Sequence, residues 1–217
     1  LLLRSYFGIP VSAPYNLDDM AADTVGLLDA LELSAAHLVG MSMGGMISQI
    51  VAGRYPDRVL SLTSIMSTSG ERGKGEASLK VSLKMVQPVS KDKTPLDIAV
   101  DIWQMLCGPA YPMTDSEIRA QVIAEHKRSS NPAGYMRQIS AIRTSPSRVA
   151  LLNAIKVPTL IIHGNQDVLV PVSGGIDTAK HIAHAELVRF EGMGHTLPRE
   201  LLETFADLIV NNSAVQT

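Results

Sequence analysis

The sequence has a single cysteine and no long apolar or like-charged run. Because Cys107 has no second cysteine to pair with, an intrachain disulfide is impossible and the disulfide frameworks of small secreted domains are excluded. We therefore expect a reducing, cytoplasmic environment. The opening leucines at residues 1–3 are followed at once by Arg4, so this run is too short for a signal-peptide core or a membrane span.

Charge of one sign is also scarce. The formal net charge is -2 and charged residues make up 18% of the chain, without blocks that would attract nucleic acid or an anionic membrane. We therefore expect a small-molecule partner, no nucleic acid and no membrane. Hydrophobic residues make up 46%, which is enough for the packed core of one domain, with room for a small subdomain.

Four short apolar runs are bounded by turn residues and separated by helical patterns, at residues 37–41, 59–66, 159–163 and 185–190. Their apolar character is nearly continuous, which is typical of strands covered by helices on both faces. The sequence therefore predicts an α/β protein with a mostly parallel sheet.

Three helical patterns flank these runs. Asn16 is a suitable N-cap for the first helix, which we expect to pack on the sheet through Met20, Thr24, Leu27, Leu28 and Leu31. The second helix begins near Gly44 and ends at Tyr55, because Pro56 follows. The third spans residues 200–210, with one apolar side formed by Leu201, Leu202, Phe205, Leu208 and Ile209.

The strand pattern disappears between the second and third apolar runs. Residues 69–148 begin with a glycine- and lysine-rich loop and continue as helical stretches broken by prolines. A structureless connection of this length is rare inside a compact domain, so we interpret residues 69–148 as a helical lid insertion. Residues 1–68 and 149–217 are then the two parts of one core.

The pentapeptide Gly40-Met41-Ser42-Met43-Gly44 matches G-x-S-x-G. By itself it is equally compatible with a flexible turn, but it lies between a predicted strand and a predicted helix, where this motif exposes a nucleophilic serine. We expect glycines two residues either side of Ser42 because bulkier side chains would clash. The backbone N–H of Met43 is suited to stabilise an oxyanion.

A serine nucleophile needs a base and an orienting carboxylate. His195 follows the last strand in a glycine-rich loop, whereas His163 ends a strand and is predicted to be buried and structural. Asp167 follows the third strand, where open α/β sheets build their sites, although an Asx-turn would explain it equally well. The chain order Ser42, Asp167, His195 is that of the nucleophile-elbow hydrolases.

On these residues the sequence resembles the α/β-hydrolase fold superfamily, particularly its esterase-like members with a helical lid. The resemblance is carried by residues 17–46, by the acid loop at 164–171 and by the histidine loop at 192–195. It implies a catalytic triad of Ser42, Asp167 and His195, with Met43 in the oxyanion hole. It also implies ester hydrolysis through an acyl-serine intermediate, without a metal or organic cofactor.

In this family four strands precede the strand that carries the serine, whereas here a single helix and a short lead-in do. We therefore expect a chain that lacks the N-terminal strands, together with the loop that provides the second oxyanion donor. Loss of one such donor costs about 10²–10³ in rate. It also leaves an exposed apolar sheet edge, which favours pairing with another chain and predicts a homo-oligomer.

The substrate side is predicted less specifically. Met41, Met193 and Leu197 surround the inferred triad and are candidates for an adaptable apolar pocket. Together these features favour a serine hydrolase of small to medium carboxylic esters. Thioesterase, lactonase and carbon–carbon bond hydrolase activities share the same residues, and a noncatalytic binding protein or inactive fragment on the same fold is the contrasting alternative.

Overall fold

A parallel sheet forms the centre of the molecule. The computed structural model describes residues 13–85, 92–129 and 131–215. Its strands lie side by side in the order of the chain, all parallel: β1 (Ala36–Met41), β2 (Val59–Ile65), β3 (Thr159–Gly164) and β4 (Glu186–Phe190). Each strand falls on one of the four apolar runs. The predicted α/β class and parallel sheet are confirmed, and β3 is buried at every position.

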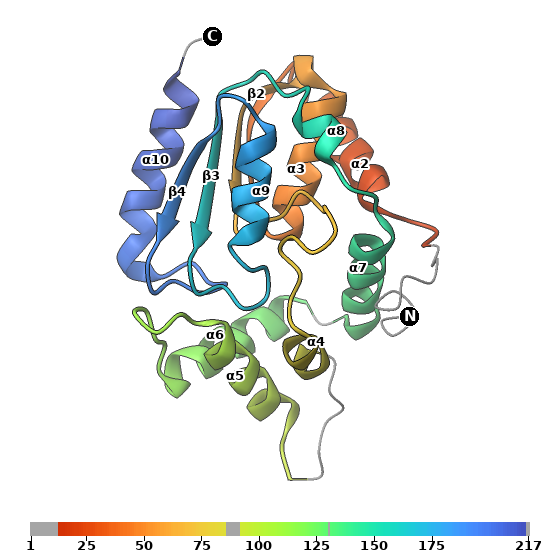
Figure 1. Ribbon diagram of the computed structural model, residues 1–217. Helices are drawn as coiled ribbons and strands as arrows, with labels where there is room; N and C mark the ends of the chain where they lie inside the picture. The colour runs from red at the N-terminus through yellow and green to blue at the C-terminus, as the bar shows by residue number, and fades with distance from the viewer. Residues whose placement is uncertain (1–12, 86–91, 130, 216–217) are drawn as a thin grey trace.

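Helices cover both faces of this sheet (Figure 1). On one face lie α3 (Met43–Arg54), α9 (Ser173–His181) and the short α8 (Val149–Leu152), and a core cluster there includes Ile50, Leu62 and Leu152. On the other face lies α10 (Leu202–Ala214), whose Phe205 packs with Leu160 of β3. Burial of each such apolar side chain contributes roughly 1.5–3 kcal/mol, so these clusters hold the two layers against the sheet.

The first helix begins where the sequence predicts but packs differently. Asn16 caps α2 (Leu17–Ala30) by accepting hydrogen bonds from the backbone of Asp18 and Asp19. The helix lies against α3 rather than on the sheet, and its buried residues are Leu17, Ala21 and Leu28. The predicted apolar face was therefore partly wrong, since Leu27 and Leu31 are 59% and 58% exposed. A helix that packs on another helix buries a narrower stripe than one on a sheet.

The third predicted helix is also close to its expected place. A 3-10 turn, η2 (Arg199–Leu201), leads into α10, and Phe205, Leu208 and Ile209 face the core as predicted. Leu202 is 47% exposed, which corrects its predicted position on the apolar side.

The segment between β2 and β3 is helical. It contains α4 (Leu79–Met85), α5 (Pro95–Leu106), α6 (Asp115–Arg128) and α7 (Pro132–Thr144). Capping boxes begin two of them, at Thr94 for α5 and at Thr114 for α6. Figure 1 shows α4, α5 and α6 beyond the carboxyl ends of the strands, where the polar loops after β3 and β4 also lie. The interpretation of residues 69–148 as a lid insertion remains a prediction.

A buried arginine joins this segment to the core. Arg148 precedes α8, is 3% exposed, and donates hydrogen bonds to Gln49 Oε1 of α3 and to the carbonyl oxygen of Thr68. Burial lowers its pKa to about 10, so the side chain is charged at neutral pH. It ties the chain after α7 to the loop that follows β2.

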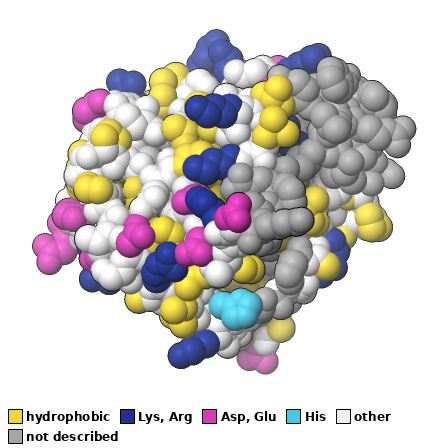
Figure 2. Space-filling model, turned by 90° about the horizontal axis from the view of Figure 1, so that it is seen from below, with side chains coloured by type: hydrophobic (Ala, Val, Ile, Leu, Met, Phe, Trp, Pro, Cys, Tyr) yellow, Lys and Arg dark blue, Asp and Glu magenta, His cyan; other side chains and the backbone are white. Residues whose placement is uncertain are grey.

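The surface carries mixed charges. Seen from beyond the carboxyl ends of the strands, the coloured part of the molecule in Figure 2 interleaves Lys and Arg with Asp and Glu and with apolar side chains, without a field of one sign. Among the helices that the structure describes, none has the length and apolar character needed to cross a membrane.

Candidate active site

Ser42 occupies a strained turn between β1 and α3. Its backbone has φ 54° and ψ −117°, a conformation that costs a residue other than glycine on the order of 1–3 kcal/mol. Two hydrogen bonds from the end of β2 hold it there. The N–H of Ser42 donates to the carbonyl of Ile65 at 2.8 Å, and the hydroxyl of Ser67 donates to the carbonyl of Ser42 at 2.8 Å.

The two glycines that flank Ser42 differ in how much space a side chain would have. A Cβ at Gly40 would lie 2.3 Å from the carbonyl oxygen of Gly44, so β1 and α3 approach too closely there for any side chain. A Cβ at Gly44 would meet nothing within 4 Å, and the prediction that Gly44 avoids a clash was wrong. The crowded position is Gly45, whose Cβ would lie 2.7 Å from that of Ser67.

The start of α3 leaves a donor available. Met43 is the first residue of this helix, where backbone N–H groups have no intrahelical acceptor. Within the described part of the chain, the N–H of Met43 donates to no other group. The positive end of the helix dipole lies at the same place, so a developing negative charge beside Ser42 would be stabilised there.

Asp167 lies in the loop after β3 with its carboxylate buried. Oδ1 accepts hydrogen bonds from the backbone N–H groups of Leu169 at 2.9 Å and Val170 at 2.8 Å, which is an Asx-type turn as the sequence allowed. Oδ2 lies 2.6 Å from Nδ1 of His195. The carboxylate thus has one oxygen that forms the turn and one oxygen directed at the histidine, so the two interpretations of Asp167 do not exclude each other.

The environment keeps Asp167 ionised. Burial alone would raise its pKa, but the polar contacts with His163 and His195 and the N–H of Val170 outweigh burial and hold that pKa below its usual range. A negative charge on Oδ2 requires a hydrogen on Nδ1 of His195. The other ring nitrogen, Nε2, is then free to accept a proton.

His195 lies in the loop after β4 and is 8% exposed. Its backbone N–H donates to the carbonyl of Leu106 at the end of α5, at 2.8 Å. The N–H of Ala110 donates in turn to the carbonyl of Gly192 at 3.1 Å. The histidine loop is therefore held by the segment that follows α5 as well as by the sheet.

Side chains and backbone also join the histidine loop to the acid loop. Glu191 accepts hydrogen bonds from the amides of Asn165 and Gln166, which lower the pKa of its carboxyl. The backbone N–H of Gln166 donates to the carbonyl of Met193 at 3.0 Å. These contacts join two loops that are separated in the sequence by α9 and β4 and that carry Asp167 and His195.

All three predicted catalytic residues follow the carboxyl ends of parallel strands, Ser42 after β1, Asp167 after β3 and His195 after β4. They therefore lie along the same edge of the sheet. The structure pairs Asp167 with His195. Among the described residues, the hydroxyl of Ser42 forms no hydrogen bond with the histidine, as is common in ligand-free hydrolase sites.

The three predicted substrate-contacting residues lie in different surroundings. Met41 and Leu197 are 45% and 41% exposed, so their side chains are accessible. Met193 is fully buried and packs in the core cluster with Phe205. This corrects its predicted place on an apolar wall, because its side chain fills the space between the sheet and α10.

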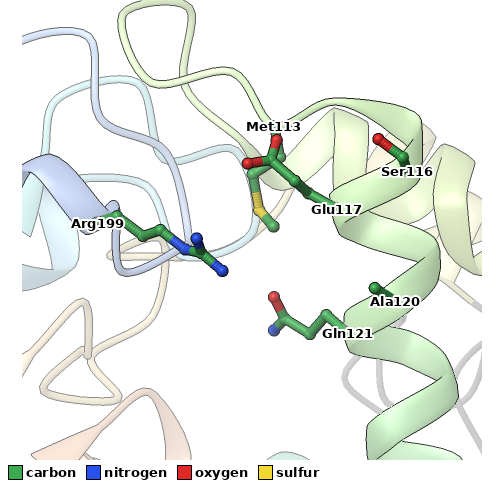
Figure 3. A pocket seen from close by; sticks show the side chains of 6 residues that line it. All are labelled: Met113, Ser116, Glu117, Ala120, Gln121 and Arg199. Carbon is green, nitrogen blue, oxygen red and sulfur yellow. The ribbon is translucent and has the colours of Figure 1, made fainter.

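A pocket lies between α6 and η2, with a volume of about 490 Å³. Figure 3 shows Arg199 and Gln121 extending into this space from opposite sides, with Met113 and Glu117 above them. Ser116 and Ala120 complete the lining. No sequence pattern singled out these residues, because Glu117 of α6 and Arg199 of η2 are far apart in the sequence and each is indistinguishable there from an ordinary solvated charge. Ser42, Asp167 and His195 do not line this pocket.

Comparison with known proteins points to one family. A family model for the α/β hydrolase fold matches residues 8–92. A rhodomycin D methylesterase of Streptomyces peucetius is 28% identical over 228 residues, covering 94% of this chain and 75% of that protein. A 2-hydroxymuconate semialdehyde hydrolase of Pseudomonas sp. strain CF600 is 29% identical over 210 residues, covering 92% and 69%.

Solved structures agree on the fold. A meta-cleavage product hydrolase from Pseudomonas fluorescens IP01 has a TM-score of 0.71 at 21% identity, covering 94% of this chain and 73% of that one. An enol-lactonase from Burkholderia xenovorans LB400 has a TM-score of 0.68 at 20% identity, covering 93% and 74%. With its parallel sheet, its serine turn and these matches, the chain has the α/β-hydrolase fold.

Proposed function

We propose that this protein is a serine hydrolase that cleaves carboxylic esters of small to medium acyl groups. The observation that carries the proposal is the 2.6 Å contact between Asp167 Oδ2 and His195 Nδ1, at the sheet edge that also carries the strained Ser42 turn. The sequence relatives support hydrolysis as the reaction class, since their names include a methylesterase, a 2-hydroxymuconate semialdehyde hydrolase and an enol-lactonase.

The proposed reaction uses each residue at a defined atom. Oγ of Ser42 attacks the ester carbonyl carbon while Nε2 of His195 accepts the hydroxyl proton. The carbonyl oxygen becomes an oxyanion, which the N–H of Met43 at the start of α3 stabilises. The tetrahedral intermediate collapses to an acyl-serine as His195 returns the proton to the departing alcohol oxygen.

Water completes the cycle at the same groups. His195 removes a proton from the water, whose oxygen attacks the acyl carbon, and then protonates Oγ as the carboxylic acid is released. Asp167 stays ionised throughout, because its role is to orient the imidazole and to stabilise the imidazolium. The low pKa of its carboxyl is suited to this role.

Covalent labelling tests the proposal directly. A fluorophosphonate probe is applied to the chain, and the labelled peptide is mapped by mass spectrometry. We expect a single adduct on Ser42 that disappears in Ser42→Ala and in His195→Ala. Ser213→Ala in α10 and His126→Ala in α6 serve as matched controls, because neither residue takes part in the Asp167–His195 contact. Both variants should label normally.

A series of p-nitrophenyl esters of increasing acyl length then measures kcat and KM. We expect hydrolysis that favours the shorter acyl chains and is absent in Ser42→Ala. A folded chain without an adduct on Ser42 contradicts the serine mechanism. Labelling of Ser42 without turnover of any ester contradicts ester hydrolysis and transfers the proposal to another acyl or carbon–carbon substrate.

A further inference from the structure

A second histidine lies beside the acid loop. His163 is the penultimate residue of β3, and its side chain is fully buried. Its Nε2 lies 2.7 Å from the carbonyl oxygen of Val170. Because a carbonyl only accepts hydrogen bonds, Nε2 carries a hydrogen and donates it to Val170.

This hydrogen bond closes the loop that carries Asp167. Val170 accepts from His163 through its carbonyl and donates through its N–H to Oδ1 of Asp167, at 2.8 Å. The same Nε2 of His163 lies 3.6 Å from Oδ2 of Asp167, the oxygen that faces His195. This distance exceeds that of a hydrogen bond, but the N–H dipole acts on the carboxylate through a buried, weakly screened space.

The other ring nitrogen of His163 is unfavourably placed. Nδ1 of His163 is buried and has no hydrogen-bond partner among the described residues. A Cβ at Gly175 of α9 would lie 2.4 Å from that atom, so the helix approaches the ring closely. A buried polar atom left without a partner is unfavourable, and an apolar side chain of similar size would avoid that loss. The chain retains an imidazole here although only one of its nitrogens is satisfied.

We propose that His163 is a positioning residue for the Asp167–His195 pair, fixing the acid loop through Val170 and orienting Oδ2 toward His195 Nδ1. The proposal rests on the proposed function for its kinetic consequence. We do not expect His163 to touch the substrate, because its side chain is fully buried and its polar neighbours are Val170 and Asp167 of the acid loop. It acts on the reaction by setting where Oδ2 lies and how much negative charge His195 experiences.

The test replaces the donor while preserving the bulk. His163→Phe keeps a ring but has no N–H, whereas His163→Gln retains an amide N–H that reaches toward Val170. We expect kcat on a p-nitrophenyl ester to fall about 10- to 100-fold in His163→Phe with KM little changed, as a misaligned catalytic group affects turnover more than binding. Part of the loss should be recovered in His163→Gln.

Two readouts separate positioning from mere folding. Without the N–H dipole, the charge on Asp167 is less compensated and favours the imidazolium of His195, so the acidic limb of the kcat/KM profile should move to higher pH. The downfield proton resonance of the His195 Nδ1–H should shift in His163→Phe and less in His163→Gln. Ile162→Val, on the same buried strand, controls for stability and should change neither readout.

Gly175→Ala provides a second route, since it displaces the ring without removing a polar atom, and it remains informative if His163→Phe does not fold. If folded His163→Phe or Gly175→Ala has the kcat, pH profile and resonance of the wild type, the proposal is overturned. It is also overturned if kcat of His163→Gln is no higher than that of His163→Phe. The resonance is measured without substrate. Failure of ester hydrolysis in the wild type would therefore count against the proposed function, while the resonance shifts still decide the role of His163.

Discussion

At the scale of single residues, the carboxylate of Asp167 links stability and chemistry. Burial acts to raise its pKa, and the contacts with His163, His195 and Val170 lower it further than burial raises it. A carboxyl whose pKa is lower in the folded state than in the unfolded state stabilises the fold at pH values above its unfolded pKa, about 4. That contribution is lost as pH falls through the lower, folded-state value, so the pair should weaken only in strong acid.

Asp167→Asn should abolish most activity while keeping the fold. The amide oxygen is expected to take the place of Oδ1 and accept from Leu169 and Val170, which turns the NH2 group toward His195. Nδ1 of His195 would then have to accept, and its hydrogen would move to Nε2, the atom that must accept the proton of Ser42. Loss of the correct tautomer costs about 10⁴ in kcat in a well-studied triad, and we expect a loss of similar order here.

The measurement is kcat for an activated ester at neutral pH, with circular dichroism to confirm folding. Asp177→Asn is a matched control, because Asp177 is also buried and accepts a hydrogen bond from Ser69, yet lies on α9 away from the pair. It should lower stability and leave kcat nearly unchanged. Wild-type kcat in folded Asp167→Asn would exclude Asp167 as the orienting carboxylate.

At the scale of elements, the end of α5 and the histidine loop are fitted together. His195 donates to Leu106, and Ala110 donates to Gly192, so backbone bonds join the two segments on both sides of Gly108. A Cβ at Gly108 would lie 1.9 Å from the carbonyl oxygen of Gly192. A helix of the segment between β2 and β3 therefore helps to set the position of His195, the proposed catalytic base, and displacement of that helix would displace the histidine loop.

Gly108→Ala should reduce kcat by about 10- to 100-fold, because displacement of a catalytic group by 1 Å can cost that much. The rate of fluorophosphonate labelling at Ser42 should fall in parallel. Gly26→Ala provides the control, since a Cβ in α2 would meet no atom within 4 Å and alanine favours a helix by about 1 kcal/mol. Equal labelling rates in Gly108→Ala and wild type would show that the histidine loop does not depend on this contact.

At the scale of the whole molecule, β1 is the first strand of the described sheet and pairs only with β2 there. Leu38 packs toward the core on the α3 side, whereas Val39 and Met41 on the opposite side are 50% and 45% exposed. An exposed apolar edge strand favours pairing with another chain. The predicted homo-oligomer through this edge remains a prediction that concerns the assembly rather than the fold.

Val39→Lys should weaken any self-association, since a charge on an edge strand opposes its pairing. Sedimentation velocity over a range of protein concentrations measures the change. Val210→Lys, on the exposed side of α10, replaces an apolar residue that is 61% exposed and should leave association unaltered. A wild-type chain that stays monomeric at every concentration would rule out pairing through β1.

The sequence by itself determined the order of strands and helices and the candidates Ser42, Asp167 and His195. Apolar runs, caps such as Asn16 and the glycine-flanked serine are local signals, and parallel strands bring their carboxyl ends to one edge whatever the details of packing. For these reasons each strand lies within two residues of its expected limits and Asp167 meets His195.

Only the tertiary structure decided which faces are buried and which contacts support the site. Burial of Met193 depends on neighbours far away in the sequence, and the crowding at Gly40 depends on how closely β1 approaches the start of α3. The contact of His163 with the acid loop joins β3 to a backbone carbonyl seven residues later, and no residue pattern indicates that the ring reaches this carbonyl. Such contacts depend on three-dimensional distances, which local propensity and periodicity do not encode.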